Sequence, residues 1–130
     1  MDKELIDSAI GAMRRAYAPY SNFSVGAAVR ADDGRVYAGC NVENAAYPIG
    51  NCAETSAIAA MIMGGAKRIT AVAVAGAGQA LVTPCGGCRQ RIREFAAPDV
   101  PVYVAGEEGH RATFTLQELL PEAFGPENLS

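Results

Sequence analysis

Two short stretches decide how this chain folds: Asn51-Cys52-Ala53-Glu54 and, further along, Pro84-Cys85-Gly86-Gly87-Cys88. Each lies where the residue pattern predicts the start of a helix, so three thiols and one carboxylate approach a common point from two helix N-termini. In proteins Zn²⁺ takes four ligands, and a catalytic zinc site leaves one position to water. We therefore predict one catalytic Zn²⁺ per chain, bound by Cys52, Cys85 and Cys88.

The placement of these groups suits that chemistry. A thiol must lose its proton to bind zinc, and the partial positive charge and free N–H groups of a helix N-terminus lower thiol pKa values. The Cys-x-x-Cys spacing of Cys85 and Cys88 puts both sulfurs on one face of a helix. Glu54 lies two residues after Cys52 and points another way, so we do not expect it to be a ligand. We predict that it is the general acid–base group at the open position of the metal.

The composition is that of one globular domain. The chain has 130 residues, of which 50% are hydrophobic and 19% charged, and we expect a single domain over residues 1–130. A net charge of -3 argues against nucleic-acid binding, and no apolar run reaches the roughly 18 residues of a membrane span. The N-terminus opens with charged residues and lacks an apolar signal segment, so we expect a cytoplasmic protein. Cysteines stay reduced there, which disfavours structural disulfides.

Helical and strand patterns alternate along the chain. We expect helices over residues 2–17, 52–63 and 85–95, strands over 24–31, 35–41, 69–75 and 101–105, a short edge strand over 113–115 and a last helical turn over 116–120. This order predicts an α/β fold of three layers, α/β/α, with a mixed five-stranded sheet. The helix over 52–63 is apolar on nearly every side, which is typical of a helix in a core or between subunits.

The cysteine stretches together resemble the zinc-dependent nucleoside deaminases, whose three-cysteine variant carries a glutamate that is not a ligand. More specifically, the chain resembles the short-chain cytidine deaminases. The further matching segments are Pro19-Tyr20-Ser21-Asn22-Phe23, Val25-Gly26-Ala27-Ala28, Gly39-Cys40-Asn41-Val42-Glu43-Asn44 and Leu119-Leu120-Pro121-Glu122-Ala123-Phe124. The resemblance covers essentially the whole chain, and the combined spacing is far more specific than any single motif.

The resemblance implies a reaction: the hydrolytic deamination of cytidine and 2′-deoxycytidine to uridine or deoxyuridine and ammonia, in pyrimidine salvage. It implies that Cys52, Cys85 and Cys88 hold the zinc ion and that zinc hydroxide attacks C4 of the base. It also implies that Glu54 carries the proton from water to the ring nitrogen and on to the leaving ammonia.

The resemblance further implies which residues bind the small-molecule nucleoside. Asn41 and Glu43 would hydrogen-bond the ribose 3′-hydroxyl, and Phe23 would pack in the pocket. Ala53 would also contact the substrate, and Phe124 would reach the base bound by a neighbouring subunit. Family members of this length are homotetramers, so a homotetramer is implied here.

One position departs from the family pattern. Many three-cysteine members have Arg directly after the glutamate, whereas this chain has Thr55. Three thiolates leave the metal cluster negatively charged, so we expect the two helix dipoles, or another cation such as Arg89, to offset that charge. Blasticidin deaminases look similar at this position, which leaves a cytosine-nucleoside analogue such as blasticidin S as an alternative substrate. The pair of Asn41 and Glu43 favours a ribonucleoside.

Simpler interpretations exist for the cysteine stretches. Cys85 and Cys88 also fit a thioredoxin-like redox pair, although that leaves Cys52 unexplained. Asn51 and Glu54 fit a capping box at the start of a helix. A purely structural zinc module is a further alternative, and it would need a fourth protein ligand.

The other candidate residues also have simpler interpretations. No fourth cysteine or histidine lies near the motif in the sequence, so only Cys40 could supply the fourth zinc ligand, and it is more simply interpreted as a small buried apolar residue. His110, the only histidine, lies in a Gly-rich segment and is expected to be solvated. Asn41 and Glu43 also fit the capping of a turn, and Phe124 fits ordinary C-terminal packing.

Overall fold

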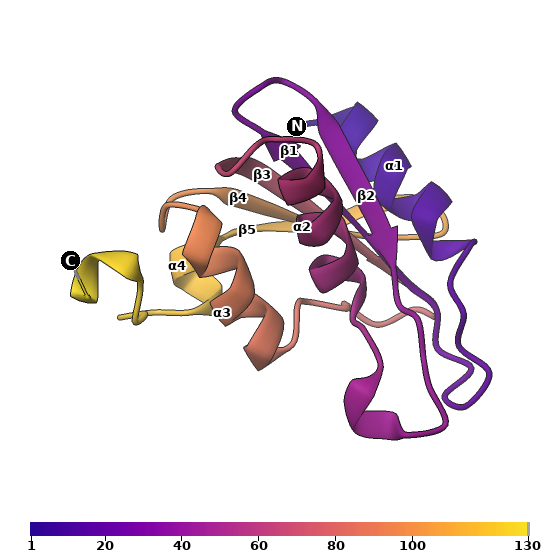
Figure 1. Cartoon of the computed structure of the whole chain (residues 1–130). Helices are drawn as coiled ribbons and strands as arrows, with labels where there is room; N and C mark the ends of the chain where they lie inside the picture. Colours follow the sequence, from indigo (N-terminus) through magenta and orange to yellow (C-terminus); the bar gives the residue numbers. More distant parts are fainter. Residues whose placement is uncertain (130) are drawn as a thin grey trace.

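A five-stranded mixed sheet forms the centre of the computed structural model, which describes residues 1–129 (Figure 1). The strands are β1 (Val25–Ala31), β2 (Val36–Cys40), β3 (Ile69–Gly76), β4 (Pro101–Gly106) and β5 (Gly109–Thr115), in the spatial order β2-β1-β3-β4-β5. Strand β1 pairs antiparallel with β2 and β3, β3 runs parallel to β4, and β4 pairs antiparallel with β5. The parallel pair requires a crossover, which helix α3 (Gly86–Phe95) provides.

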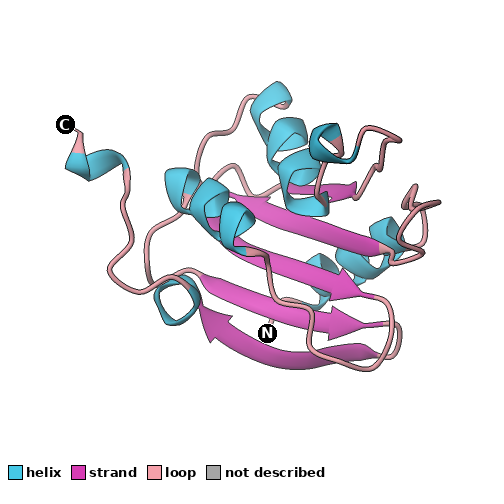
Figure 2. Ribbon diagram, turned by 90° about the horizontal axis from the view of Figure 1, so that it is seen from below, coloured by secondary structure: helices cyan, strands magenta, loops and turns pink. Residues whose placement is uncertain are grey.

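Helices cover both faces of the sheet, whose strands run side by side in Figure 2. Helix α1 (Lys3–Met13) packs on one face, and α2 (Ala53–Met63), α3 and α4 (Leu116–Leu119) pack on the other. Successive strand residues point to opposite faces, so Ala73 and Ala75 meet α1, whereas Val72 and Val74 lie in the core under α2 and α3. The predicted three-layer α/β/α architecture is confirmed.

Two glycines allow the helices to approach the sheet closely. A Cβ atom at Gly26 in β1 would lie 2.1 Å from the carbonyl oxygen of Ala9 in α1. A Cβ atom at Gly39 in β2 would lie 2.5 Å from the backbone nitrogen of Ala57 in α2. Both distances are far shorter than a van der Waals contact with backbone. Helix α2, which follows Cys52 and carries Glu54, is therefore seated directly on β2.

The first helix ends at Met13, earlier than the expected residue 17. Tyr17 instead pairs with a distant loop: its N–H donates to the Asn41 carbonyl (3.0 Å), and its carbonyl accepts from the Glu43 N–H (2.9 Å). These long-range bonds replace intrahelical ones, which is why apolar periodicity alone placed the helix end too late.

The C-terminal strand is longer than expected. Strand β5 begins at Gly109, where a positive φ of 128° closes the turn from β4, and not at Thr113. Its polar first residues concealed it, because an edge strand needs few apolar side chains. Thr115 and Glu118 then form a capping box that starts α4. Within residues 1–129, no helix is long and apolar enough to cross a lipid bilayer.

Candidate functional site

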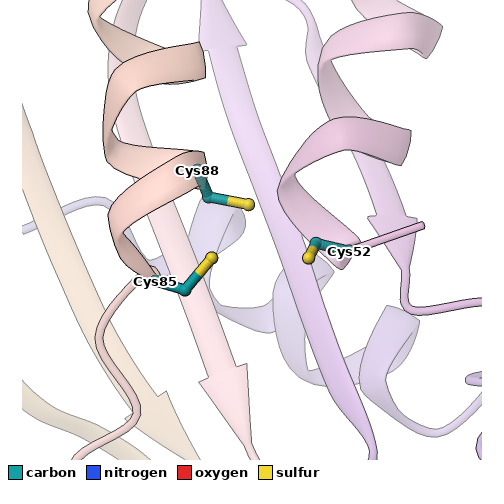
Figure 3. Close-up of side chains that lie close together, drawn as sticks. All are labelled: Cys52, Cys85 and Cys88. Atoms are coloured by element: carbon teal, nitrogen blue, oxygen red, sulfur yellow. The ribbon is translucent and has the colours of Figure 1, made fainter. Parts of the chain in front are cut away.

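Three cysteines converge where α2 and α3 begin (Figure 3). Cys52 is the N-cap residue of α2, Cys85 is the N-cap residue of α3, and Cys88 lies in the first turn of α3. Their sulfur atoms all lie within 4.8 Å of one another, and in Figure 3 the side chains point toward a common space between the two helices. The structure thus brings together the three thiols that the sequence predicts as ligands.

This cluster has the dimensions of a zinc site. A Zn–S bond is about 2.3 Å long, so two sulfurs on one tetrahedral zinc lie about 3.8 Å apart. The sulfurs here lie within 4.8 Å, and among residues 1–129 no fourth metal-binding side chain joins them. A donor set of three thiols therefore fits zinc with one ligand position left open, which is the arrangement of a catalytic centre.

The two other candidate ligands are engaged elsewhere. The Cys40 thiol donates to the carbonyl of Arg15 at 3.6 Å. His110 Nε2 hydrogen-bonds Thr113 Oγ1 at 2.7 Å, on strand β5. A closed, purely structural zinc site consequently lacks its fourth ligand in the described part of the chain.

The three thiols differ in how readily they ionise. Burial raises the pKa of Cys88, and the nearby charge of Glu54 raises it further. Burial also raises the pKa of Cys52. The backbone N–H of Cys88, by contrast, hydrogen-bonds the sulfur of Cys85 and lowers the pKa of that thiol. A bound dication would stabilise all three thiolates, so metal binding and loss of protons are coupled here.

Glu54 lies beside the cluster, in the first turn of α2, and is only 4% exposed. Cys52, and not Asn51, is the N-cap residue of α2, and no side chain caps this helix, so the capping box of Asn51 with Glu54 is wrong. Burial raises the pKa of Glu54, while the Cys88 thiol and the charge of Arg91 act in the opposite direction. A buried carboxyl group with a raised pKa is suited to take up and release a proton.

The loop over residues 41–51 is tied to the start of α2. Val42 and Asn51 exchange two backbone hydrogen bonds of 2.9 Å each, one residue before Cys52. The bonds between Tyr17 and this loop add the segment that precedes β1. Two loops far apart in sequence are thereby held next to the cysteine cluster.

A pocket of about 240 Å³ lies between these loops, lined by Tyr20, Ser21, Glu43, Asn44, Tyr47 and Gly50. The Glu43 carboxylate accepts the backbone N–H groups of Tyr20 (2.9 Å) and Ser21 (3.1 Å) and the Ser21 hydroxyl. The bond from the Ser21 hydroxyl lowers the pKa of Glu43 and keeps this group ionised. An ionised carboxylate at a pocket wall accepts hydrogen bonds from a hydroxyl-bearing molecule.

Asn41 lies at the base of the same loop and is not among the lining residues of this pocket. Its Oδ1 accepts the N–H of Val25 (2.9 Å), and its Nδ2 donates to the carbonyl of Phe23 (2.9 Å). The amide therefore fixes the entry into β1, as the turn-capping interpretation expects, and retains one donor hydrogen and one acceptor lone pair.

The remaining predicted site residues are dispersed. Phe23 is 40% exposed at the loop surface, and Ala53 is the buried first residue of α2. Phe124 is 56% exposed on the C-terminal segment, where its carbonyl accepts a hydrogen bond from Gln90 Nε2 (2.8 Å). Within one chain, over residues 1–129, only Glu43 of the predicted substrate-binding set lines the loop pocket.

Sequence reasoning assigned no role to Ser21, which fixes Glu43, and named Arg89 as one example of a cation that could offset the charge of the cluster. Arg89 donates to the carbonyls of Pro84 (2.6 Å) and Leu119 (2.7 Å), so it anchors the loop before α3. It is Arg91 that contacts a ligand sulfur. Its position one helical turn after Cys88 was the signal that could have identified it.

Comparisons with known proteins agree with this geometry. The family model for the cytidine and deoxycytidylate deaminase zinc-binding region matches residues 1–104. The cytidine deaminase of Sporosarcina psychrophila is 45% identical over 131 residues, which cover 100% of this chain and 96% of that protein. The cytidine deaminase of Halalkalibacterium halodurans is 42% identical, with 100% of this chain and 99% of that protein covered.

Solved structures show the same fold. The crystal structure of cytidine deaminase from Burkholderia pseudomallei matches with a TM-score of 0.88 and 41% identity, covering 95% of this chain and 99% of that chain. The cytidine deaminase structure from Mycobacterium tuberculosis matches with a TM-score of 0.82 and 38% identity, covering 94% and 95% respectively.

Proposed function

Because this chain belongs to the cytidine and deoxycytidylate deaminase family, we propose that it hydrolyses cytidine and 2′-deoxycytidine to uridine or deoxyuridine and ammonia. Water adds at C4 of the base and the exocyclic amino group leaves, so the reaction consumes one water and releases one ammonia. The observation that carries this proposal is the three-thiol cluster beside a buried, unligated carboxyl group, Glu54.

Cys52, Cys85 and Cys88 are the residues that would hold one zinc ion per chain. When bound, zinc supplies Lewis acidity, which makes water a stronger nucleophile near neutral pH. The chain contributes two helix N-termini, whose partial positive charge favours the thiolate form of the ligands. It also buries Cys88 completely, which protects that sulfur from solvent and from oxidation.

Glu54 serves as the proton carrier. Its carboxylate takes a proton from the attacking water and delivers it to the ring nitrogen next to C4. It then carries the second proton of that water, from the hydroxyl group now on C4, to the amino group, which leaves as ammonia while the C4 carbonyl forms. Burial raises the pKa of Glu54, which makes its protonated form accessible during turnover. Because the side chain is not a ligand, it is free to move between these atoms.

The two loops bind the nucleoside. Glu43 accepts a hydrogen bond from the ribose 3′-hydroxyl, and the spare donor hydrogen of Asn41 supports the same group. Phe23 packs against the bound ligand, and the free backbone N–H of Ala53 at the start of α2 contacts the base. The preference for a ribonucleoside over an analogue such as blasticidin S rests on Glu43, whose ionised state Ser21 maintains.

The protein acts as a homotetramer of single deaminase domains, each comprising residues 1–130. Large apolar side chains are exposed near the pocket and at the end of α2, and these include Tyr47 (73%), Ile49 (67%) and Met63 (89%). Such surfaces are typical of subunit contacts. Phe124, exposed on an extended C-terminal segment, reaches the base bound by a neighbouring subunit.

The enzyme acts in pyrimidine salvage in the cytoplasm. Its zinc ligands are three free thiols, one of them exposed at the start of α3. A reducing compartment keeps such thiols in the state that binds metal.

Ammonia release from a panel of cytidine, deoxycytidine, cytosine and blasticidin S tests the proposal, with zinc measured in the same preparation. We expect about one zinc per chain and turnover of both nucleosides but not of the free base, which has no ribose. Turnover of blasticidin S alone would replace the substrate assignment. Zinc without any turnover would identify a structural zinc module.

A further inference from the structure

An arginine on α3 reaches the buried zinc ligand. Arg91 lies one helical turn after Cys88, and its Nη1 donates to Cys88 Sγ at 3.9 Å. Cys88 is 0% exposed, whereas Arg91 is an exposed residue, so the guanidinium reaches a buried sulfur from the surface of α3. A guanidinium at this distance favours the negatively charged thiolate form of the sulfur.

The backbone next to Arg91 leaves room for this contact. A Cβ atom at Gly87 would lie 3.2 Å from Arg91 Nη1, which is closer than an ordinary van der Waals contact. Gly87 lies between the two cysteines of α3, so the absence of a side chain there lets the guanidinium approach their helix turn.

Arg91 also faces the position that departs from the family pattern. A groove between α2 and α3 is lined by Thr55, Ile58, Gln90, Arg91, Glu94 and Phe95. Thr55 directly follows Glu54 and carries no charge. The neutral side chain on α2 and the cation on α3 therefore line the same space beside the cluster.

The other arginines of α3 are engaged in holding the fold. Arg89 donates to two backbone carbonyls and to a threonine hydroxyl, and Arg93 pairs with Glu127. For Arg91, the hydrogen-bond acceptor in the described part of the chain is Cys88 Sγ, and no ion pair joins Arg91 to Glu94 there. Arg91 is thus the cation of α3 that serves the cluster.

We propose that Arg91 balances the negative charge of the zinc–thiolate cluster from α3, in place of a cation at position 55 on α2. Three thiolates exceed the charge of one divalent ion, and the nearby Glu54 carboxylate adds to the excess. A guanidinium beside Cys88 offsets this charge and strengthens zinc binding. The inference rests on the proposed function only for the identity of the metal.

Zinc affinity measured by competition with a chromophoric chelator tests this role without reference to turnover. Arg91→Gln removes the charge, Arg91→Lys keeps it, and Lys67→Gln removes one positive charge from an exposed site elsewhere. We expect Arg91→Gln to bind zinc about tenfold more weakly than the unchanged protein, as is usual when a group that supports a metal ligand is lost. Arg91→Lys and Lys67→Gln should stay within about threefold of it.

A transfer of the charge sharpens the test. Thr55→Arg added to Arg91→Gln should restore zinc affinity to within about threefold of the unchanged protein, because the cation returns to the same groove from the other helix. The inference would be overturned if Arg91→Gln bound zinc as tightly as the unchanged protein, or if Arg91→Lys bound zinc as weakly as Arg91→Gln. It would also be overturned if Thr55→Arg did not restore the zinc affinity of Arg91→Gln. Failure of the proposed reaction would show differently, as tight zinc binding with no ammonia release from cytidine.

Discussion

The cysteine cluster and the loop pocket are neighbours, but they are built in different ways. The cluster stands on the first turns of two helices over the core, where Cys88 is 0% and Glu54 4% exposed. The pocket is formed by loops whose side chains are exposed, with Tyr47 at 73%. Under the proposed function, helices hold the groups that perform chemistry, whereas loops hold those that select the substrate.

This contrast separates two kinds of effect on catalysis. A change in the cluster should alter the rate of the chemical step, because its groups act on the reacting atoms. A change in the pocket should alter mainly substrate binding, since under the proposed function its groups contact the part of the nucleoside that does not react.

The largest effect is expected for Glu54→Gln. The amide cannot take up a proton from water, so kcat for cytidine should fall by about 10²–10⁴-fold. Ammonia release under saturating substrate measures it. Zinc content and the thermal unfolding midpoint should stay near those of the unchanged protein, because Glu54 is not in the ligand set. A variant that keeps its rate would remove Glu54 from the mechanism.

The cluster was also the part that the sequence predicted best. The spacing between Cys85 and Cys88 is local, and their helix start follows from Pro84 and the two glycines. The layers follow from alternating helices and strands. Local signals of this kind survive folding unchanged, so the fold class and the three thiols could be predicted correctly.

What the sequence missed depends on contacts between distant segments. The end of α1 is set by bonds from Tyr17 to the loop after β2, and the state of Glu43 is set by Ser21. Which arginine of α3 reaches a sulfur depends on side-chain direction and on the space left at Gly87. Periodicity carries no information on such pairings, and the position of Phe124 depends on a second subunit under the proposed assembly.

In the pocket, Glu43→Gln should weaken binding more than turnover. Loss of the ionised acceptor should lower kcat/KM for cytidine about tenfold, through a higher KM and a nearly unchanged kcat. Asp99→Asn, which removes an exposed carboxylate away from both regions, is the matched control and should change neither constant. A fall in kcat equal to the fall in kcat/KM would place Glu43 in the chemical step and break the contrast.

Phe124→Ala tests whether the pocket is completed by a neighbouring subunit. Loss of the aromatic ring should raise KM for cytidine about threefold to tenfold, because a stacking contact with the base is lost. Leu129→Ala removes a more exposed apolar side chain (81%, against 56% for Phe124) from the same C-terminal segment and should have no effect.

Mixed oligomers show which subunit Phe124 serves. Combining Glu54→Gln chains with Phe124→Ala chains should recover sites of normal KM, in which an intact Glu54 is paired with a Phe124 from the other chain. If mixing leaves KM at the value of the Phe124→Ala protein, the ring acts within its own chain and the proposed arrangement fails.

The smallest expected effect is a shift in the pH dependence of KM, which should be confined to the pocket. The Ser21 hydroxyl lowers the pKa of Glu43 below its ordinary value of 4.5, so this carboxylate stays ionised as the solution is acidified. In Ser21→Ala that bond is lost, the pKa of Glu43 rises, and KM should begin to increase at a higher pH than in the unchanged protein. Steady-state kinetics with cytidine from pH 7 downward measure the shift, and comparison at each pH cancels any titration of the substrate itself.

The acidic limb of the kcat profile should stay in place, because it reports the cluster side of the site. If the pH dependence of kcat shifted by the same amount as that of KM, the two regions would titrate as one unit, and the loops would take part in the chemical step as well as in substrate binding.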